Sequence, residues 1–232
     1  MGSSTSSTSR SSAPERLAQQ TQHQHQQRQQ SQTQQQQEVP RPSLPVGAEG
    51  RLVRQILCEV IPGLWLGSRD AGCQLGLLRS MGITACVNCT DEAHLHPTHL
   101  KYYHVEVVDS PSVDIVQYVA NGVFPWVGKQ LASDSRSAVL VYCHRGVSRS
   151  VTIILALLLH LRPTWTLLQC WHHVKRVRPS MRPNPGFLAQ LVAYERSLRG
   201  TSSVRVSKKA KGLVAWTGSA DPTPSLESTR VV

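Results

Sequence analysis

A short apolar segment, 138–142, leads directly into a mostly polar segment, 143–150, which is followed by a long apolar segment, 151–161. The first has the length and Val content of a buried strand, and the third has the length of a buried helix. A loop between a buried strand and a helix gathers backbone N–H groups at the helix N-terminus, where an anion is stabilised. This order predicts an α/β fold with an anion site in the 143–150 loop.

The side chains of the 143–150 loop suit phosphoryl chemistry. Cys143 opens the loop, and the positive field at the helix start favours its nucleophilic thiolate form. Gly146 allows a turn that a side chain would obstruct. Six residues after Cys143, Arg149 offers a planar guanidinium that holds two phosphoryl oxygens, and Ser150 adds a hydroxyl. The loop therefore predicts phosphoryl transfer. The alternative is that Cys143 is a thiol of the core and Arg149 is a cation at the surface.

Composition divides the chain into three parts. Residues 1–50 are rich in Ser, Thr, Gln and Pro without apolar periodicity, which predicts a disordered arm. Residues 51–199 are rich in Val, Leu and Ile and have the size of one domain. Residues 200–232 turn polar again and predict a disordered basic tail. These features exclude an acidic disordered chain, a collagen-like chain and a multi-domain assembly.

Apolar patterning in the middle part predicts alternating strands and helices. Strands are expected at 56–60, 64–66, 84–88 and 102–108. Helices are expected at 71–81, 113–131 and 166–177, with another starting near Asn184. Pro125 predicts a kink or a late start in the second helix, and Asn184 with Pro185 forms a typical helix start. The expected architecture is an α/β sandwich.

Neither the apolar segments nor the cysteines indicate export. The 151–161 segment is shorter than the roughly 20 apolar residues that cross a membrane, and residues 1–50 contain no apolar stretch of a secretory signal. We therefore expect a cytosolic or nuclear protein whose six cysteines are reduced. Cys86 and Cys89 have C-x-x-C spacing in a strand-like segment without a second pair, which favours buried thiols over a zinc or redox site.

The 143–150 loop matches the pattern C-x-x-G-x-S-R-S/T and resembles that of dual-specificity protein tyrosine phosphatases. Segments 61–68, 82–88 and 182–191 resemble the opening strand pair, the next strand and the last helix start of that family. The similarity spans about 55–198 with no rhodanese-like docking domain before it, as in the small, atypical members. It implies a protein tyrosine phosphatase-like α/β fold, with a central mixed, mostly parallel sheet flanked by helices.

The resemblance also implies a mechanism that needs neither metal nor organic cofactor. Cys143 would attack phosphorus, Asp109 would act as general acid, and Ser150 would ease departure of the thiolate. The phosphate would be bound by the rest of the loop: His144, Arg145, Gly146, Val147, Ser148 and Arg149. Such a protein hydrolyses phosphotyrosine and phosphoserine or phosphothreonine. Without the family pattern, Asp109 is equally a solvated loop carboxylate.

One position departs from the family. Tyr142 stands where the family usually has a His that organises the loop and keeps the thiol ionised. A Tyr donates a hydrogen bond but does not become a cation at neutral pH. We therefore expect a slower enzyme. The alternative is that Tyr142 serves only as a buried aromatic filler of the core. The alternative function is a weak or inactive pseudophosphatase that binds phosphoproteins.

Phosphoproteins, such as signalling kinases, are the expected partners of a monomeric protein. Phosphoinositides, RNA 5′-phosphates and glucans remain alternatives. Polyphosphorylated ligands would favour several basic side chains in the loop, but residue 147 is Val, so only His144 and Arg145 supplement Arg149. The pI of 9.9 is compatible with nucleic acid, but 51–199 lacks zinc-finger spacing and RNA-binding aromatic motifs. Its basic cluster fits the steering of acidic phosphopeptides; it consists of Lys175, Arg176, Arg178 and Arg182. We therefore expect no nucleic-acid partner.

The first six residues match the N-myristoylation pattern M-G-x-x-x-S/T, which makes Gly2 a candidate lipidation site. The alternative is a Gly/Ser start of a low-complexity arm. A single myristoyl chain binds membranes only weakly, so a basic patch would be needed as well. Lys208, Lys209 and Lys211 are candidates for that patch or for a weak nuclear signal. The expected location is cytoplasmic, with nuclear or membrane-associated forms as alternatives.

Overall fold

A computed structural model describes residues 48–207 and 212–215. Gly2, the predicted arm over most of 1–50, the Lys208–Lys211 cluster and the end of the predicted tail lie outside the described residues. Within them, no helix combines the length and the apolar character that crossing a membrane requires.

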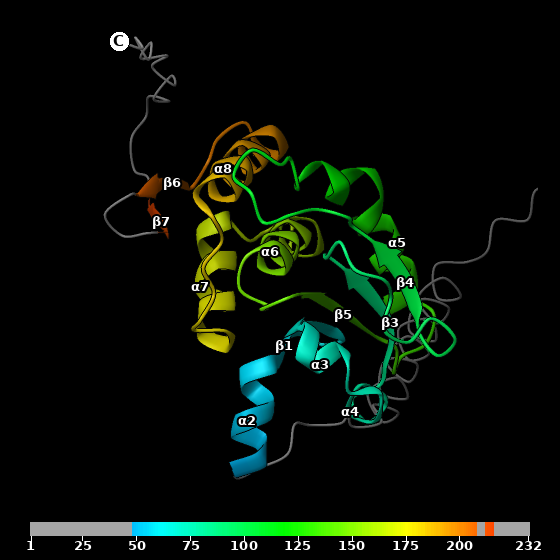
Figure 1. The fold of residues 1–232 in the computed structure, drawn as a ribbon. Coiled ribbons are helices and arrows are strands. Elements are labelled where there is room, and N and C mark those ends of the chain that lie inside the picture. Colours follow the sequence, from blue (N-terminus) through cyan, green and yellow to red (C-terminus); the bar gives the residue numbers. More distant parts are fainter. Residues whose placement is uncertain (1–47, 208–211, 216–232) are drawn as a thin grey trace, which may run out of the picture. The chain divides into compact units, whose positions relative to one another are not determined.

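The described chain is built on a five-stranded sheet with the order β1-β2-β5-β3-β4. Figure 1 labels β1, β5, β3 and β4 of this sheet. Its strands are β1 (Leu57–Ile61), β2 (Leu64–Ser68), β3 (Ile83–Asn88), β4 (Lys101–His104) and β5 (Ala138–Cys143). β1 runs antiparallel to β2, whereas the pairs β2–β5, β5–β3 and β3–β4 are parallel. This mixed, mostly parallel sheet confirms the expected fold class, and it places β5 at the centre.

Helices cover both faces of the sheet. They are α2 (Ala48–Ile56), α3 (Arg69–Gly72), α4 (Leu75–Ser80), the π-helix η1 (Val119–Val123), α5 (Phe124–Leu131), α6 (Arg149–Leu161), α7 (Leu167–Val177) and α8 (Pro185–Arg199). Val139 and Val141 of β5 face the core formed with η1 and α5 to α8, and Leu140 and Tyr142 face the smaller core with α3 and α4. α6 lies against the sheet with residues 149–159 buried, which explains why it has no polar face.

Local signals place the helix ends. Asn184 accepts a hydrogen bond from the backbone of Phe187 and caps α8, as predicted. Pro125 stands in the first turn of α5, which follows the π-helix η1 without a break, so the predicted 113–131 helix is divided into a π-helical and an α-helical segment just before Pro125. The predicted 71–81 helix is instead divided into α3 and α4, because Gln74 adopts a non-helical conformation between them.

Two strands lie where the sequence predicted a tail. β6 (Val204–Ser207) and β7 (Gly212–Ala215) form an antiparallel pair, which we call the C-terminal hairpin. Val204 and Leu213 bury their side chains in the larger core. The prediction for 200–232 missed this hairpin because each strand has four residues and the segment between them is polar. It also missed α2.

Candidate active site

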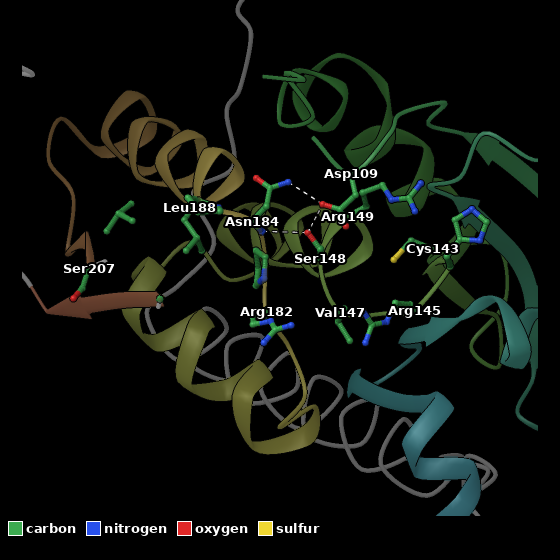
Figure 2. A pocket seen from close by; sticks show the side chains of 15 residues that line it. Asp109, Cys143, Arg145, Val147, Ser148, Arg149, Arg182, Asn184, Leu188 and Ser207 are labelled. Atoms are coloured by element: carbon green, nitrogen blue, oxygen red, sulfur yellow. Dashed lines mark hydrogen bonds between the residues drawn. The ribbon is translucent and has the colours of Figure 1, made fainter. Parts of the chain in front are cut away.

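The 143–150 loop lies at the carboxyl end of β5, where ligands typically bind in open α/β sheets. Cys143 ends the strand and Arg149 begins α6. A cavity of about 670 Å³ opens over the loop (Figure 2). Seven predicted site residues line it: Asp109, Cys143, His144, Arg145, Val147, Ser148 and Arg149. The other two, Gly146 and Ser150, are buried and do not line it.

The backbone carbonyls of the loop are bonded to groups outside it. His144 O accepts from Arg69 N (3.1 Å), Arg145 O and Gly146 O from the Arg178 guanidinium (3.1 Å each), and Val147 O from Arg182 N (2.7 Å). In a trans peptide the N–H points away from the C=O. The N–H groups of residues 145–148 are therefore turned the opposite way, as an anion cradle requires.

Two residues behind the loop fix this shape. Arg178 is 3% exposed, and its guanidinium also donates to the backbone oxygen of Gln55 at the end of α2. Gly146 has φ +65°, and a Cβ there would lie 2.6 Å from the Gly67 carbonyl oxygen. The turn predicted for Gly146 is thus required by both its backbone angle and the neighbouring strand.

Cys143 is 2% exposed and Ser150 is fully buried. Their side-chain atoms, Sγ and Oγ, are 3.1 Å apart. The Ser150 hydroxyl is therefore in place to donate a hydrogen bond to a thiolate at Cys143.

The side chain of Arg149 is nearly buried, and a hydrogen bond to the backbone fixes its guanidinium. It is 7% exposed, and its Nη1 donates to the backbone oxygen of Val107 at 3.0 Å. Its Nε is buried and has no hydrogen-bond partner in the described part of the chain, which is uncommon for a buried donor. Asp91 lies 3.9 Å from Nη1 and was not predicted from the sequence. Hydrogen bonds from its own backbone and from His144 lower the pKa of the Asp91 carboxyl, so it remains an anion.

Asp109 lines the same cavity as Cys143, and two hydrogen bonds reach one oxygen of its carboxylate. Ser148 Oγ and Asn184 Nδ2 each donate to Oδ1 at 2.8 Å (Figure 2). Asn184 N also donates to Ser148 Oγ, at 3.2 Å. The sequence indicated Asn184 only as a helix cap; its contact with Asp109 depends on the tertiary fold.

Tyr142 lies behind the nucleophile and is 1% exposed. Its hydroxyl is buried and finds no hydrogen-bond partner within the described residues. Burial raises the pKa of this phenol well above its ordinary value, so it stays neutral. Its ring packs in the smaller core, which matches the aromatic-filler interpretation.

Two substitutions at Tyr142 are expected to have different effects. Tyr142→Phe removes the unpartnered hydroxyl and should raise the free energy of unfolding by about 1 kcal/mol without lowering turnover. Tyr142→His supplies a group that carries positive charge beside the thiol and should raise kcat/KM for an aryl phosphate about tenfold, since about 1.4 kcal/mol of thiolate stabilisation corresponds to that factor. Urea unfolding and assays at pH 6 measure these effects. A loss of activity in Tyr142→Phe would contradict the filler interpretation.

The remaining buried cysteines are poor nucleophiles. Burial raises the pKa of Cys58 to about 11 and those of Cys86 and Cys170 to about 12. Cys86 and Cys89 belong to the two different cores, on opposite faces of the sheet, so their C-x-x-C spacing does not bring the thiols together. Among the described residues, no group of three metal-binding side chains is present.

Comparison with known proteins identifies the family. The model of the dual specificity phosphatase catalytic domain matches residues 64–197. The chain belongs to the dual specificity phosphatase family. Human dual specificity protein phosphatase 14 is 35% identical over 161 residues, covering 68% of this chain and 78% of that protein. Human dual specificity phosphatase 28 is 34% identical over 159 residues, covering 68% and 88%.

A solved structure supports the same assignment. The crystal structure of human DUSP28 superposes with a TM-score of 0.58 and 29% identity, covering 68% of this chain and 99% of that one. The family resemblance inferred from the 143–150 loop is thereby confirmed. The match to the dual specificity phosphatase model runs from β2 into α8, so α2, β1 and the C-terminal hairpin lie outside it.

Proposed function

We propose that this dual specificity phosphatase hydrolyses phosphotyrosine and phosphoserine or phosphothreonine in proteins through a cysteinyl-phosphate on Cys143. The observation that carries the proposal is the outward bonding of the loop carbonyls, which leaves the N–H groups and Arg149 to receive a phosphoryl group above Cys143. Membership in the family supports the reaction class.

In the first step, the Cys143 thiolate attacks phosphorus, and the S–P bond forms while the P–O bond to the substrate breaks. The loop N–H groups and the Arg149 guanidinium stabilise the charge on the phosphoryl oxygens. Asp109, in its protonated form, donates its proton to the leaving oxygen. Because Ser148 and Asn184 both bond to Oδ1, Oδ2 is the oxygen that carries this proton.

In the second step, water attacks phosphorus, the S–P bond breaks, and inorganic phosphate leaves. Asp109 takes the proton from the water and returns to its acidic form. The Ser150 hydroxyl, 3.1 Å from the sulfur, donates a hydrogen bond to the departing thiolate.

The second candidate is a phosphoprotein-binding protein with little or no turnover. It is favoured by Tyr142, whose neutral, buried phenol provides no positive charge beside the thiol. A phosphate would still bind to the loop and Arg149, but it would be hydrolysed slowly or not at all.

Phosphate release by the purified full chain separates the two candidates. We expect turnover of a small aryl phosphate and of phosphotyrosine and phosphothreonine peptides, all abolished in Cys143→Ser. A matched variant, Cys170→Ser, removes a buried thiol of α7, so it controls for effects that arise from losing any buried cysteine. Absence of turnover between pH 5 and 8, with phosphopeptide binding retained, would favour the second candidate.

A further inference from the structure

The cavity over the loop extends well beyond the phosphate site. Figure 2 shows Cys143 toward one end and Leu188 and Ser207 toward the other. The apolar residues that line the cavity outside the loop, which we call the apolar arm, are Pro183, Pro185, Leu188, Val206 and Gly212. A tetrahedral phosphate fills only a small part of about 670 Å³, so a substrate has room to place a further group in the arm.

The C-terminal hairpin, which supplies one wall of the arm, is anchored to the domain. Glu195 of α8 is 1% exposed, and its carboxylate accepts hydrogen bonds from Ser202 Oγ and Ser203 N at 2.8 Å each. It also accepts from Leu167 N at the start of α7, at 2.6 Å. This buried carboxylate joins α7, α8 and the segment that enters β6. The hairpin wall is therefore a built part of the cavity.

Val206 and Val214 lie on opposite faces of the hairpin, and only Val206 of the two lines the cavity. In antiparallel pairing, side chains of directly paired residues share a face. Val206 pairs with the buried Leu213, and Val206 lines the cavity while packing against the larger core. Val214 pairs with Arg205 on the other face and does not line the cavity. One hairpin thus offers a test residue and a matched control of the same type.

Continuity with the phosphate site determines what enters the arm. The arm and the phosphate site form one cavity, so a single molecule can occupy both. Arg145 belongs to the loop, and the Arg182 backbone donates to Val147 within it, whereas the arm is apolar with Ser207 as its polar neighbour, so the cavity changes from basic to mainly apolar along its length (Figure 2). The hairpin lies outside the residues that the family model matches, so this wall is not part of the matched catalytic domain.

We propose that the apolar arm is a specificity subsite that binds an apolar side chain flanking the phosphorylated residue of a phosphoprotein substrate. Val206 and Leu188 are its specificity-determining residues. The inference rests on the proposed function for the nature of the substrate. It assigns to the C-terminal hairpin a role in choosing among phosphoproteins.

Binding to the full-length Cys143→Ser protein tests the subsite without requiring turnover. The probes are fluorescent phosphotyrosine peptides of Gly and Ser in which a single Leu is moved through the positions on either side of the phosphotyrosine. Anisotropy titration gives Kd. At one position, Leu should tighten binding about tenfold relative to Gly, as expected for burial of an aliphatic side chain. Asp at that position should remove the gain.

Variants in the hairpin locate the effect. In the Cys143→Ser background, Val206→Thr exchanges a methyl for a hydroxyl and should reduce the Leu advantage about threefold, the effect of roughly one buried methyl group. Val214→Thr makes the same exchange on the other face and should retain the full advantage. Far-UV circular dichroism of both variants confirms that the hairpin exchange leaves the fold intact.

The outcomes are separable. Equal Kd for Leu at every position, or equal losses in Val206→Thr and Val214→Thr, would overturn the subsite even if phosphate release supports the proposed function. A Leu preference that depends on Val206, found without any phosphate release, would support the subsite and count against catalysis. Tighter binding of a dioctanoyl phosphoinositide than of its free head group, with no peptide preference, would assign the arm to lipid chains and overturn the proposal.

Discussion

Replacing Asp109 by Asn is expected to lower kcat by about a hundredfold or more, the usual contribution of a positioned general acid. The loss should be larger for a phosphothreonine peptide than for p-nitrophenyl phosphate, because an alkoxide needs a proton more than a stable phenolate does. The amide keeps the shape of the side chain, but its N–H protons are not acidic enough to be transferred to the leaving oxygen. Initial rates on both substrates measure the difference.

Two further variants distinguish proton donation from positioning. Ser148→Ala removes one of the two hydrogen bonds to Asp109 Oδ1, and Asn184→Asp removes the other while keeping an oxygen to cap α8. Each should lower kcat about tenfold, less than Asp109→Asn, because the acid remains. Full activity of Asp109→Asn on phosphothreonine, combined with its loss in Asp91→Asn, would transfer the acid role to the carboxylate beside Arg149.

Replacing Arg149 by Lys is expected to lower kcat by about 10²–10³, although the charge is kept. The ammonium group has no planar fork, so it cannot donate to the Val107 carbonyl and to phosphoryl oxygens in the same geometry. The carbonyl of Val107 would also lose its buried partner. Rates at saturating aryl phosphate measure the loss.

Arg182→Lys is the matched control, because Arg182 lines the same cavity but is exposed to solvent. Because the exchange keeps the positive charge, it should leave both kcat and KM for an acidic peptide nearly unchanged, as expected for a side chain that contributes long-range attraction. An unchanged kcat in Arg149→Lys would show that Arg149 acts through its charge alone, and an equal loss in both variants would show that the effect is not specific to Arg149.

Most of the fold and the centre of the site were predictable from local patterns. The Ala138–Tyr142 strand, the 143–150 loop and the buried helix after it are contiguous, and their spacing by itself indicates the phosphate site. Asn184 and Pro185 likewise mark the start of α8 through residues adjacent in the sequence. Such features depend on short-range geometry, which a sequence displays directly.

Features that depend on distant contacts were not predictable. Arg178 bonds to carbonyls more than 30 residues earlier, and its role behind the loop has no local signature. Asp91 and Asn184 reach the site only because parallel strands end at the same edge of the sheet and α8 begins beside it. The C-terminal hairpin was missed because its short strands are stabilised by Glu195 and the larger core rather than by their own pattern.

The outward bonding of the loop carbonyls also affects how anions compete for this site. Because Arg69, Arg178 and Arg182 already hold the backbone in place, binding an oxyanion costs little further conformational entropy. A rigid cradle of this kind recognises shape and charge rather than chemical origin. Tetrahedral oxyanions of similar size therefore compete with phosphorylated substrates, whereas planar anions such as nitrate fit the cradle poorly.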